Sequence, residues 1–241
     1  KGKEWFEEEI IYQIYEDGTF LQFSMNYHRV VVQLLTWAII LSERNSESFV
    51  PEVYERAKKS VMFLRTCMID ENGFLPNYGA NDGSLFFKLN DASYRDFRPA
   101  LDALAVALHI DLEFGSPSED RFWYGLESID SMHWRPSTGI HSYNAGGYYI
   151  FREMDSLTFI RCGGYKDRPS QADNLHMDVW YRGENVLLDA GSYKYNTDEK
   201  TLRYFMGTAS HNTVMLDDYD QMEKGPRFIW YNWSQKKDVC I

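Results

Sequence analysis

The sequence predicts an α+β protein in which a helical N-terminal part precedes an antiparallel sheet part. Two observations support this prediction. Through the first half of the 241 residues, apolar side chains recur at three- and four-residue steps, which is the period of an amphipathic helix. From Gly139 onward the apolar period becomes two or continuous, and turn residues separate the runs, as in antiparallel sandwiches. We expect a helical part over residues 1–115, a linker over 116–138 and a β-sandwich over 139–241.

Four helices are expected in the helical part. The first covers residues 5–15, where apolar side chains alternate with acidic ones. Ser24 is a suitable N-cap for a second helix over about Met25–Glu43. A third helix, about Pro51–Met68, has proline at a favourable first position, and a fourth covers about Arg98–Phe114. Successive helices with long irregular connections indicate antiparallel helical hairpins.

The character of the sequence changes near Gly115. The tetrapeptide 115–118 has turn composition, and the segment up to Pro136 is expected to be linker with a short helix. Short apolar runs bounded by turn residues predict strands in the remainder. The expected strands are Gly147–Arg152, Leu157–Cys162, His176–Tyr181, Asn185–Asp189, Thr213–Leu216 and Phe228–Trp233.

Composition excludes several classes of protein. The chain has 25 Lys and Arg and 36 Asp and Glu, so its net charge is −11. This charge disfavours a nucleic-acid-binding surface. An aromatic content of 16% is too high for a disordered chain. No apolar run reaches the roughly 18–20 residues that span a bilayer. The first residue is Lys and the last residues stop inside strand-like sequence, so we expect a piece of a longer protein.

Polar residues that suit a functional site gather in four short segments. Loop residues on a rigid scaffold are the usual place for binding and catalysis. The segments are residues 26–29, 76–83, 171–178 and 210–213.

Two of these segments contribute to a candidate metal site. His176 and His211 adjoin expected strands, and Asp189 ends another. Adjacent antiparallel strands would bring two imidazoles and a carboxylate together, and this donor set suits zinc. From the residues alone, capping histidines and a turn aspartate are the favoured interpretation, and the metal site is the alternative. Asn26 and His28 near a helix start are likewise compatible with purely local contacts.

Three motifs in one order point to a family. They are Gln171-Ala-Asp-Asn-Leu-His176-Met-Asp-Val-Trp180, then Gly183-Glu-Asn-Val-Leu-Leu-Asp189-Ala-Gly191-Ser-Tyr193, then Arg203-Tyr-Phe-Met-Gly-Thr-Ala-Ser-His211-Asn-Thr213. Asn26-Tyr27-His28-Arg29 and Pro76-Asn77-Tyr78-Gly79 precede them. With these motifs the sequence resembles the heparinase II/III-like polysaccharide lyases, which include heparinase III and related alginate and oligoalginate lyases.

The resemblance implies an incomplete (α/α) toroid joined to an antiparallel β-sandwich, with substrate in the cleft between them. Family members cleave uronate-containing polysaccharides by β-elimination. The implied partner is therefore an acidic poly- or oligosaccharide, and the implied location is periplasmic or secreted. The net charge of −11 favours short or weakly sulfated substrates, because long-range steering of a polyanion would be repulsive.

The resemblance also implies roles for individual residues. Asn26 is the expected neutral donor to the uronate carboxylate, with His176 or His28 assisting, since charge develops there in the transition state. Tyr78 is the expected acid and a candidate base, and Tyr94 is its rival. The arginines expected to hold anionic sugar groups are Arg29, Arg98 and Arg203.

A zinc ion is implied as well, held by His176, Asp189 and His211. Such an ion would shape the cleft wall, because elimination consumes no water for a metal to activate. Some relatives carry a further His at the position of Asn174, so His176 is a candidate for both the metal set and the catalytic set.

Two other functions remain open at this point. One is a non-catalytic carbohydrate-binding protein that keeps the lyase fold, since aromatic side chains suit sugar stacking. The other is a glycoside hydrolase, which needs two carboxylates about 5–9.5 Å apart across a sugar. Asp82 and Asp96 are the candidate pair for that reaction.

Overall fold

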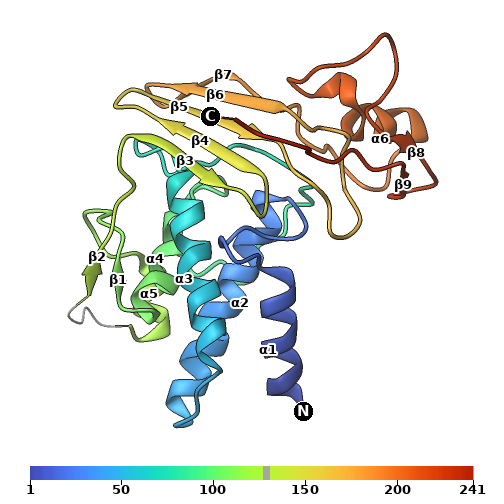
Figure 1. Ribbon diagram of the computed structural model, residues 1–241. Helices are drawn as coiled ribbons and strands as arrows, with labels where there is room; N and C mark the ends of the chain where they lie inside the picture. Colours follow the sequence, from blue (N-terminus) through green and yellow to red (C-terminus); the bar gives the residue numbers. More distant parts are fainter. Residues whose placement is uncertain (127–130, 241) are drawn as a thin grey trace.

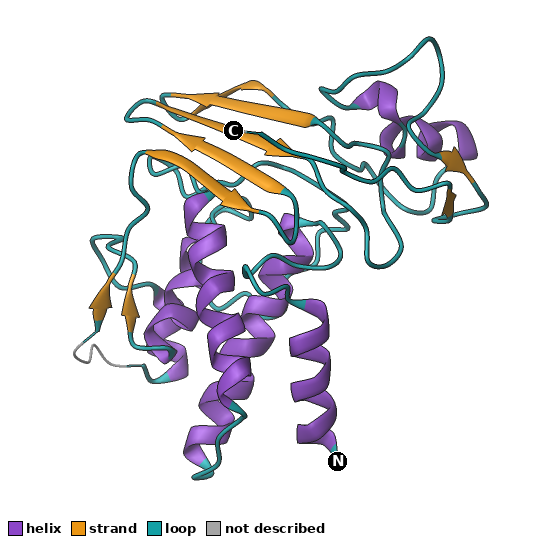
Figure 2. Ribbon diagram, in the orientation of Figure 1, coloured by secondary structure: helices purple, strands orange, loops and turns teal. Residues whose placement is uncertain are grey.

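A computed structural model describes residues 1–126 and 131–240 of the chain. Five helices lie against one face of a five-stranded sheet, and a smaller C-terminal lobe lies beyond one end of that sheet (Figure 1). Figure 2 shows the helical layer and the sheet layer as separate colours, connected by long loops. Residues 127–130 of the predicted linker and Ile241 of the predicted sheet part lie outside the described residues.

The helices follow the apolar pattern of the sequence. Ser24 is the N-cap that the sequence predicted, and its hydroxyl accepts a hydrogen bond of 3.1 Å from the amide of Tyr27. Pro51 opens the third helix, where its missing N–H costs nothing. The helices are α1 (Gly2–Gln13), α2 (Met25–Arg44), α3 (Pro51–Thr66), α4 (Arg98–Ala107) and α5 (Glu119–Tyr124).

Helix α4 is shorter than predicted. It ends at Ala107, and His109 and Glu113 adopt left-handed φ values of 58° and 57° that no helix continues through. A short strand, β1 (Ile110–Asp111), follows and pairs in parallel with β2 (Met132–His133). The apolar residues that suggested a longer helix are still buried. The pattern therefore predicted the buried positions correctly, but the prediction that they are helical was wrong.

The main sheet is an antiparallel meander with strand order β3-β4-β5-β6-β7. Its inner face carries Leu157, Phe159 and Trp180, which are all at most 3% exposed and pack in the common core. The strands are β3 (Gly139–Tyr143), β4 (Tyr148–Arg152), β5 (Ser156–Arg161), β6 (His176–Tyr181) and β7 (Glu184–Leu187).

The prediction of an antiparallel sheet is confirmed, but the described residues contain no second large sheet to complete a sandwich. Residues 213–216 are irregular, and Val214 and Leu216 are 60% and 77% exposed, because no strand or core faces them. Residues 228–233 contribute only β9 (Trp230–Tyr231), which pairs with β8 (Glu223–Lys224). The C-terminal lobe also contains a helix that was not predicted, α6 (Glu199–Met206), capped by Asp198.

Buried contacts join the helical layer to the sheet. Arg152 of β4 donates to the carbonyl oxygens of Thr66 and Met68 at 2.8 and 2.7 Å, so it satisfies the C-terminal end of α3. Phe63 of α3 packs on Tyr148 of β4 with ring centroids 5.1 Å apart. Within the described ranges, no helix combines the length and apolar character that crossing a bilayer requires.

Candidate functional site

The loop of residues 76–81 is fixed on the start of α2. Ser24 Oγ donates to the Ala80 carbonyl at 2.6 Å, and the Met25 amide donates to the Tyr78 carbonyl at 3.1 Å. Gly79 has a φ of 84°, and a Cβ at this position would lie 2.1 Å from the Phe23 carbonyl oxygen. This close approach requires glycine, and it sets Tyr78 beside the first turn of α2.

Asn26 and Tyr78 therefore line the same small hollow, of about 10 Å³. Asn26 is 3% exposed and Tyr78 is 2% exposed. The other polar residues that line the hollow are Asn77, Asn81, Tyr94 and Arg95. The structure thus brings the predicted amide and the predicted phenol together, although in this state the hollow holds at most about one water molecule.

The Asn26 amide has a defined orientation. Its Oδ1 accepts hydrogen bonds from Arg29 Nη2 at 2.9 Å and from the Tyr94 hydroxyl at 2.6 Å. Its Nδ2 is buried and has no hydrogen-bond partner. A buried amide nitrogen without a partner costs about 1–3 kcal/mol, so its retention is typical of a binding or catalytic group.

Tyr78 connects the helical layer with the inner face of the sheet. Its ring lies 5.3 Å from that of Phe159 and 5.7 Å from the imidazole of His176. Burial raises the pKa of Tyr78 well above its usual value, and nearby Asp173 raises it further, while Arg161 lowers it. The phenol is therefore protonated at neutral pH, which suits a proton donor and disfavours a base.

The sheet register places His176 on the inner face. In the antiparallel pair of β5 and β6, His176 is opposite Arg161, and Asp178 is opposite Phe159. Because side chains alternate along a strand, His176, Asp178 and Trp180 all face the helices, and each is at most 3% exposed. The sequence predicted the strand but not this orientation, because the alternate residues Met177, Val179 and Tyr181 form the more apolar set and yet face outward.

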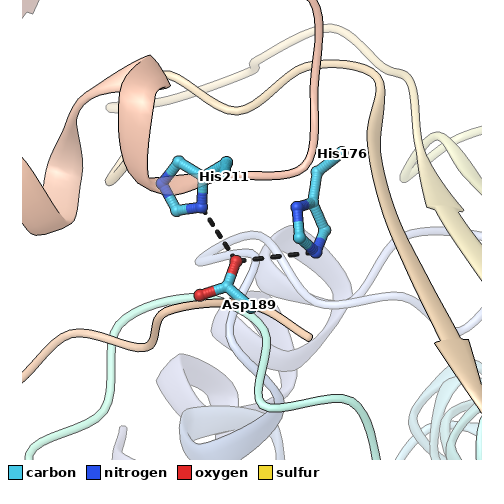
Figure 3. A group of neighbouring side chains, drawn as sticks. All are labelled: His176, Asp189 and His211. Carbon is cyan, nitrogen blue, oxygen red and sulfur yellow. Dashed lines mark hydrogen bonds and ion pairs between the residues drawn. The ribbon is translucent and has the colours of Figure 1, made fainter. Parts of the chain in front are cut away.

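His176, Asp189 and His211 form one cluster, with Asp189 between the two imidazoles (Figure 3). Asp189 Oδ2 lies 2.8 Å from His211 Nδ1 and 3.5 Å from His176 Nε2. The other carboxylate oxygen of Asp189 accepts a hydrogen bond from the Gly191 amide. One ligand atom from each of the three residues lies within 4.8 Å of the others.

The donor atoms of this cluster fit a metal ion. His176 faces Asp189 with Nε2, which is buried without a hydrogen-bond partner, and His211 faces Asp189 with Nδ1. Burial lowers the pKa of His176, which keeps its imidazole neutral, the form that binds metal. Burial alone would lower the pKa of His211 too, but the hydrogen bond to Asp189 and the negative charges of Asp173, Asp189 and Asp220 together raise it. Two imidazoles and one carboxylate in a dry site are a typical zinc ligand set.

Comparison with known proteins supports the resemblance seen in the sequence. Residues 135–238 match the family model described as heparinase II/III-like, C-terminal. The match covers the five-stranded sheet and the C-terminal lobe, which are less than half of the chain. A curated relative, the heparin-sulfate lyase of Bacteroides thetaiotaomicron, is 23% identical over 236 residues, which cover 89% of this chain and 32% of the relative.

Solved structures of heparinases share the fold of this chain. A heparinase III with methylated lysines superposes with a TM-score of 0.69 at 19% identity, over 92% of this chain and 33% of its own. The heparan sulfate lyase HepC from Pedobacter heparinus gives a TM-score of 0.66 at 20% identity, over 93% of this chain and 35% of the HepC chain. The chain thus spans about a third of the length of these relatives.

His28 does not face the site, which corrects the expectation of a catalytic role. A helix turns about 200° over two residues, so His28 points away from the side of α2 that carries Asn26. Its ring is 1% exposed, lies between Phe20 and Phe63, and forms a hydrogen bond with Ser60 of α3. His28 is therefore a core residue of the helical layer.

We expect His28 to make the fold acid-sensitive. Burial lowers the pKa of His28 to about 3, whereas an unfolded histidine titrates near 6.5. The unfolded state therefore binds a proton first, and stability that is complete above about pH 6.5 falls as the pH drops toward 3. Between pH 7 and pH 5, the wild type should lose about 2 kcal/mol more unfolding free energy than His28→Gln, in urea titrations. Equal losses in both proteins would contradict this assignment.

The three predicted arginines lie in different surroundings. Arg29 is 1% exposed and contacts Asn26 instead of an open surface. Arg98 is paired with Asp96 through bonds of 2.7 to 3.1 Å, so most of its hydrogen-bonding capacity is occupied locally. Arg203 lines a hollow of about 1060 Å³ in the C-terminal lobe. Of the three, Arg203 is placed to meet a ligand.

The sequence did not reveal two adjoining hollows beside the site. The first, about 380 Å³, lies between the helical layer and the C-terminal lobe, where the hydroxyls of Tyr27 and Tyr195 are 2.6 Å apart. The second is the hollow of Arg203, which Lys224 and Arg227 also line. Tyr27 lies in α2, Arg203 in α6 and Lys224 in β8, so only the folded chain brings these distant residues together.

The remaining candidates have structural partners. Asn174 accepts a hydrogen bond from the Gly163 amide and donates to Ser234, so it ties loops together. Asp82 accepts from Ser84 in its own turn, and Asp96 is paired with Arg98. The two carboxylates proposed for glycoside hydrolysis therefore have separate partners and no shared site.

Proposed function

We propose that this protein is a polysaccharide lyase that cleaves a uronate-containing acidic polysaccharide or oligosaccharide by β-elimination. The observation that carries the proposal is the meeting of three groups at one place: the unpartnered amide of Asn26, the protonated phenol of Tyr78 and the cluster around His176. The heparin and heparan sulfate lyases to which the chain is similar support the same reaction class. On this proposal helices α1 to α4 are a portion of an incomplete (α/α) toroid, and the protein is periplasmic or secreted.

The proposed chemistry assigns one task to each residue. The C5 proton of a uronate is weakly acidic while the adjacent carboxylate is charged. The Asn26 N–H groups would hydrogen-bond that carboxylate and stabilise the negative charge that grows on it. Tyr78 would donate its proton to the leaving glycosidic oxygen while the C5 proton passes to solvent water, so that the C5–H and C4–O bonds break and a C4–C5 double bond forms. His28, in the core, takes no part.

Substrate would enter along the two adjoining hollows. Tyr195 and Phe228 line both of them and offer aromatic faces to sugar rings. Arg203, Lys224 and Arg227 place three cations on the outer hollow, against the single carboxylate of Glu199. This local excess of positive charge suits an acidic saccharide even though the whole chain has a net charge of −11.

Incubation of the full-length protein with a panel of uronate-containing polysaccharides tests the proposal. A lyase generates an unsaturated uronate at the new non-reducing end, which absorbs in the ultraviolet. New reducing ends without that absorbance would indicate hydrolysis and would overturn the assignment. The absence of product from every uronan in the panel would also overturn the assignment.

The burial of Asn26 and Tyr78 favours one alternative function. At 3% and 2% exposure, neither side chain reaches a sugar unless the surrounding loops separate. A protein that binds acidic saccharides without cleaving them would show heat of binding by calorimetry and no ultraviolet product.

We also propose that His176, Asp189 and His211 hold a zinc ion. When bound, the zinc would hold together the start of β6 and the two loop segments that carry Asp189 and His211. These three segments would then form one wall of the cleft. His176 would then act as a ligand, and its contact with the Tyr78 ring would position the phenol.

Elemental analysis of purified protein should find one zinc per chain. Asp189→Ala and His211→Ala should lose the metal, because each removes one of three ligands. Both variants should also melt at a lower temperature, since a ligand that binds only the folded state stabilises it. The matched control is His133→Ala, an exposed histidine on β2, which should retain the metal. Metal-free wild-type protein purified without chelators would count against the site.

A further inference from the structure

The further inference concerns the two side chains that hold the Asn26 amide. An amide oxygen accepts hydrogen bonds and an amide nitrogen donates them. Arg29 has only donors to offer, so the Asn26 atom that faces it at 2.9 Å must be the oxygen. The orientation of the amide therefore follows from chemistry, and Nδ2 must point away from Arg29.

Arg29 itself is held rigidly. Its guanidinium lies between the rings of Tyr94 and Phe97, 4.4 Å from each centroid. Its Nη1 also donates to the Tyr94 carbonyl. Within the described parts of the chain, no carboxylate forms an ion pair with it. A buried charge that is held by aromatic faces and amide oxygens alone is costly, which indicates a function beyond packing.

Tyr94 donates the second hydrogen bond to the Asn26 amide oxygen. Its hydroxyl donates to Asn26 Oδ1 at 2.6 Å and lies 2.8 Å from Asn81 Oδ1. Since a hydroxyl has one proton, it can donate to only one of these oxygens at a time. When Arg29 and Tyr94 both donate hydrogen bonds to Asn26 Oδ1, the Nδ2 hydrogens of Asn26 have no acceptor within the protein. They remain available to a ligand in the hollow.

We propose that Arg29 and Tyr94 are positioning residues that fix the Asn26 amide with its oxygen away from substrate and its nitrogen toward it. This inference rests on the proposed lyase function. A donor that is already oriented costs no reorganisation when charge appears on the uronate carboxylate. The guanidinium also polarises the amide through Oδ1, which strengthens the N–H donors on the other side.

Steady-state kinetics of Tyr94→Phe test the inference. The variant keeps the ring that stacks on Arg29 and removes only the hydroxyl. We expect kcat to fall about tenfold, equivalent to roughly 1.4 kcal/mol, with KM changed less than about twofold. The matched control is Tyr143→Phe, which removes a 2.8 Å hydrogen bond to Thr66 remote from the hollow, and which should leave kcat unchanged. Arg29→Lys provides a second variant that keeps the charge and loses the planar donor.

The decisive measurement is the double variant with Asn26→Ala. If Tyr94 acts through Asn26, then Tyr94→Phe should cause no further loss of kcat once the amide is gone. Equal loss in both backgrounds, or a rise in KM at constant kcat, would overturn the positioning role while the lyase function stands. A wild-type protein without unsaturated product would remove the proposed function and this inference together.

Discussion

An Asn26→Ala variant of the full-length protein is expected to lose about 10²- to 10³-fold in kcat, which is the usual cost of deleting one oriented donor to a developing anion. The reason is the unpartnered Nδ2 of Asn26, which is buried in the hollow shared with Tyr78. In the ground state the uronate carboxylate already carries its charge, but on proton removal the charge grows and the donor contributes more. The loss should therefore fall on kcat and leave KM within a few-fold.

Asn26→Asp is the matched variant for this prediction. Aspartate has the same shape, and its carboxylate would pair with the Arg29 guanidinium that now contacts Asn26 Oδ1. The fold should be at least as stable as the wild type. Activity should nevertheless be as low as in Asn26→Ala or lower, because the donor is replaced by a charge that repels the substrate carboxylate. Lyase activity within threefold of the wild type in either variant would show that Asn26 is not the donor.

Sequence patterns located residues of the candidate site where a secondary-structure signal and a chemical motif fell on the same segment. His176 was expected at the start of a strand, and it is the first residue of β6. Ser24 as an N-cap likewise located the first turn of α2 and therefore Asn26. Local rules were sufficient in both cases, because the relevant neighbours lie within a few positions of each other.

Other features depended on contacts between distant parts of the chain. His28 was expected in the site, but α3 supplies Ser60 and Phe63, which make it a core residue. Leu216 was expected in a strand, and only the missing partner strand explains its exposure. Arg29 was expected to bind substrate, and it is the Tyr94 and Phe97 rings, more than sixty residues away, that turn it into a support for Asn26. No single-sequence pattern reports such pairings.

A Tyr78→Phe variant is expected to lose about 10²- to 10⁴-fold in kcat, the range of a general acid. The ring contacts with Phe159 and His176 involve no hydroxyl, so the variant should fold and keep its melting temperature within a few degrees. Tyr148→Phe is the control, because that buried ring lies 6.0 Å from Tyr78 and has no role in the proposed reaction. It should retain wild-type kcat.

The leaving group decides whether Tyr78 acts as an acid. A glycosidic oxygen needs a proton as it departs, whereas an aryl leaving group such as nitrophenolate does not. If Tyr78 supplies that proton, Tyr78→Phe should lose far less activity on a uronate that carries a nitrophenyl ether at C4 than on a natural disaccharide, because the oxygen on C4 is the one that leaves. Because burial raises the pKa of Tyr78 well above its usual value, the wild type should also show no loss of activity from this group as the pH rises to about 9. Equal losses on both substrates would instead assign the phenol to removal of the C5 proton, and would require a state of the protein in which its pKa is lowered.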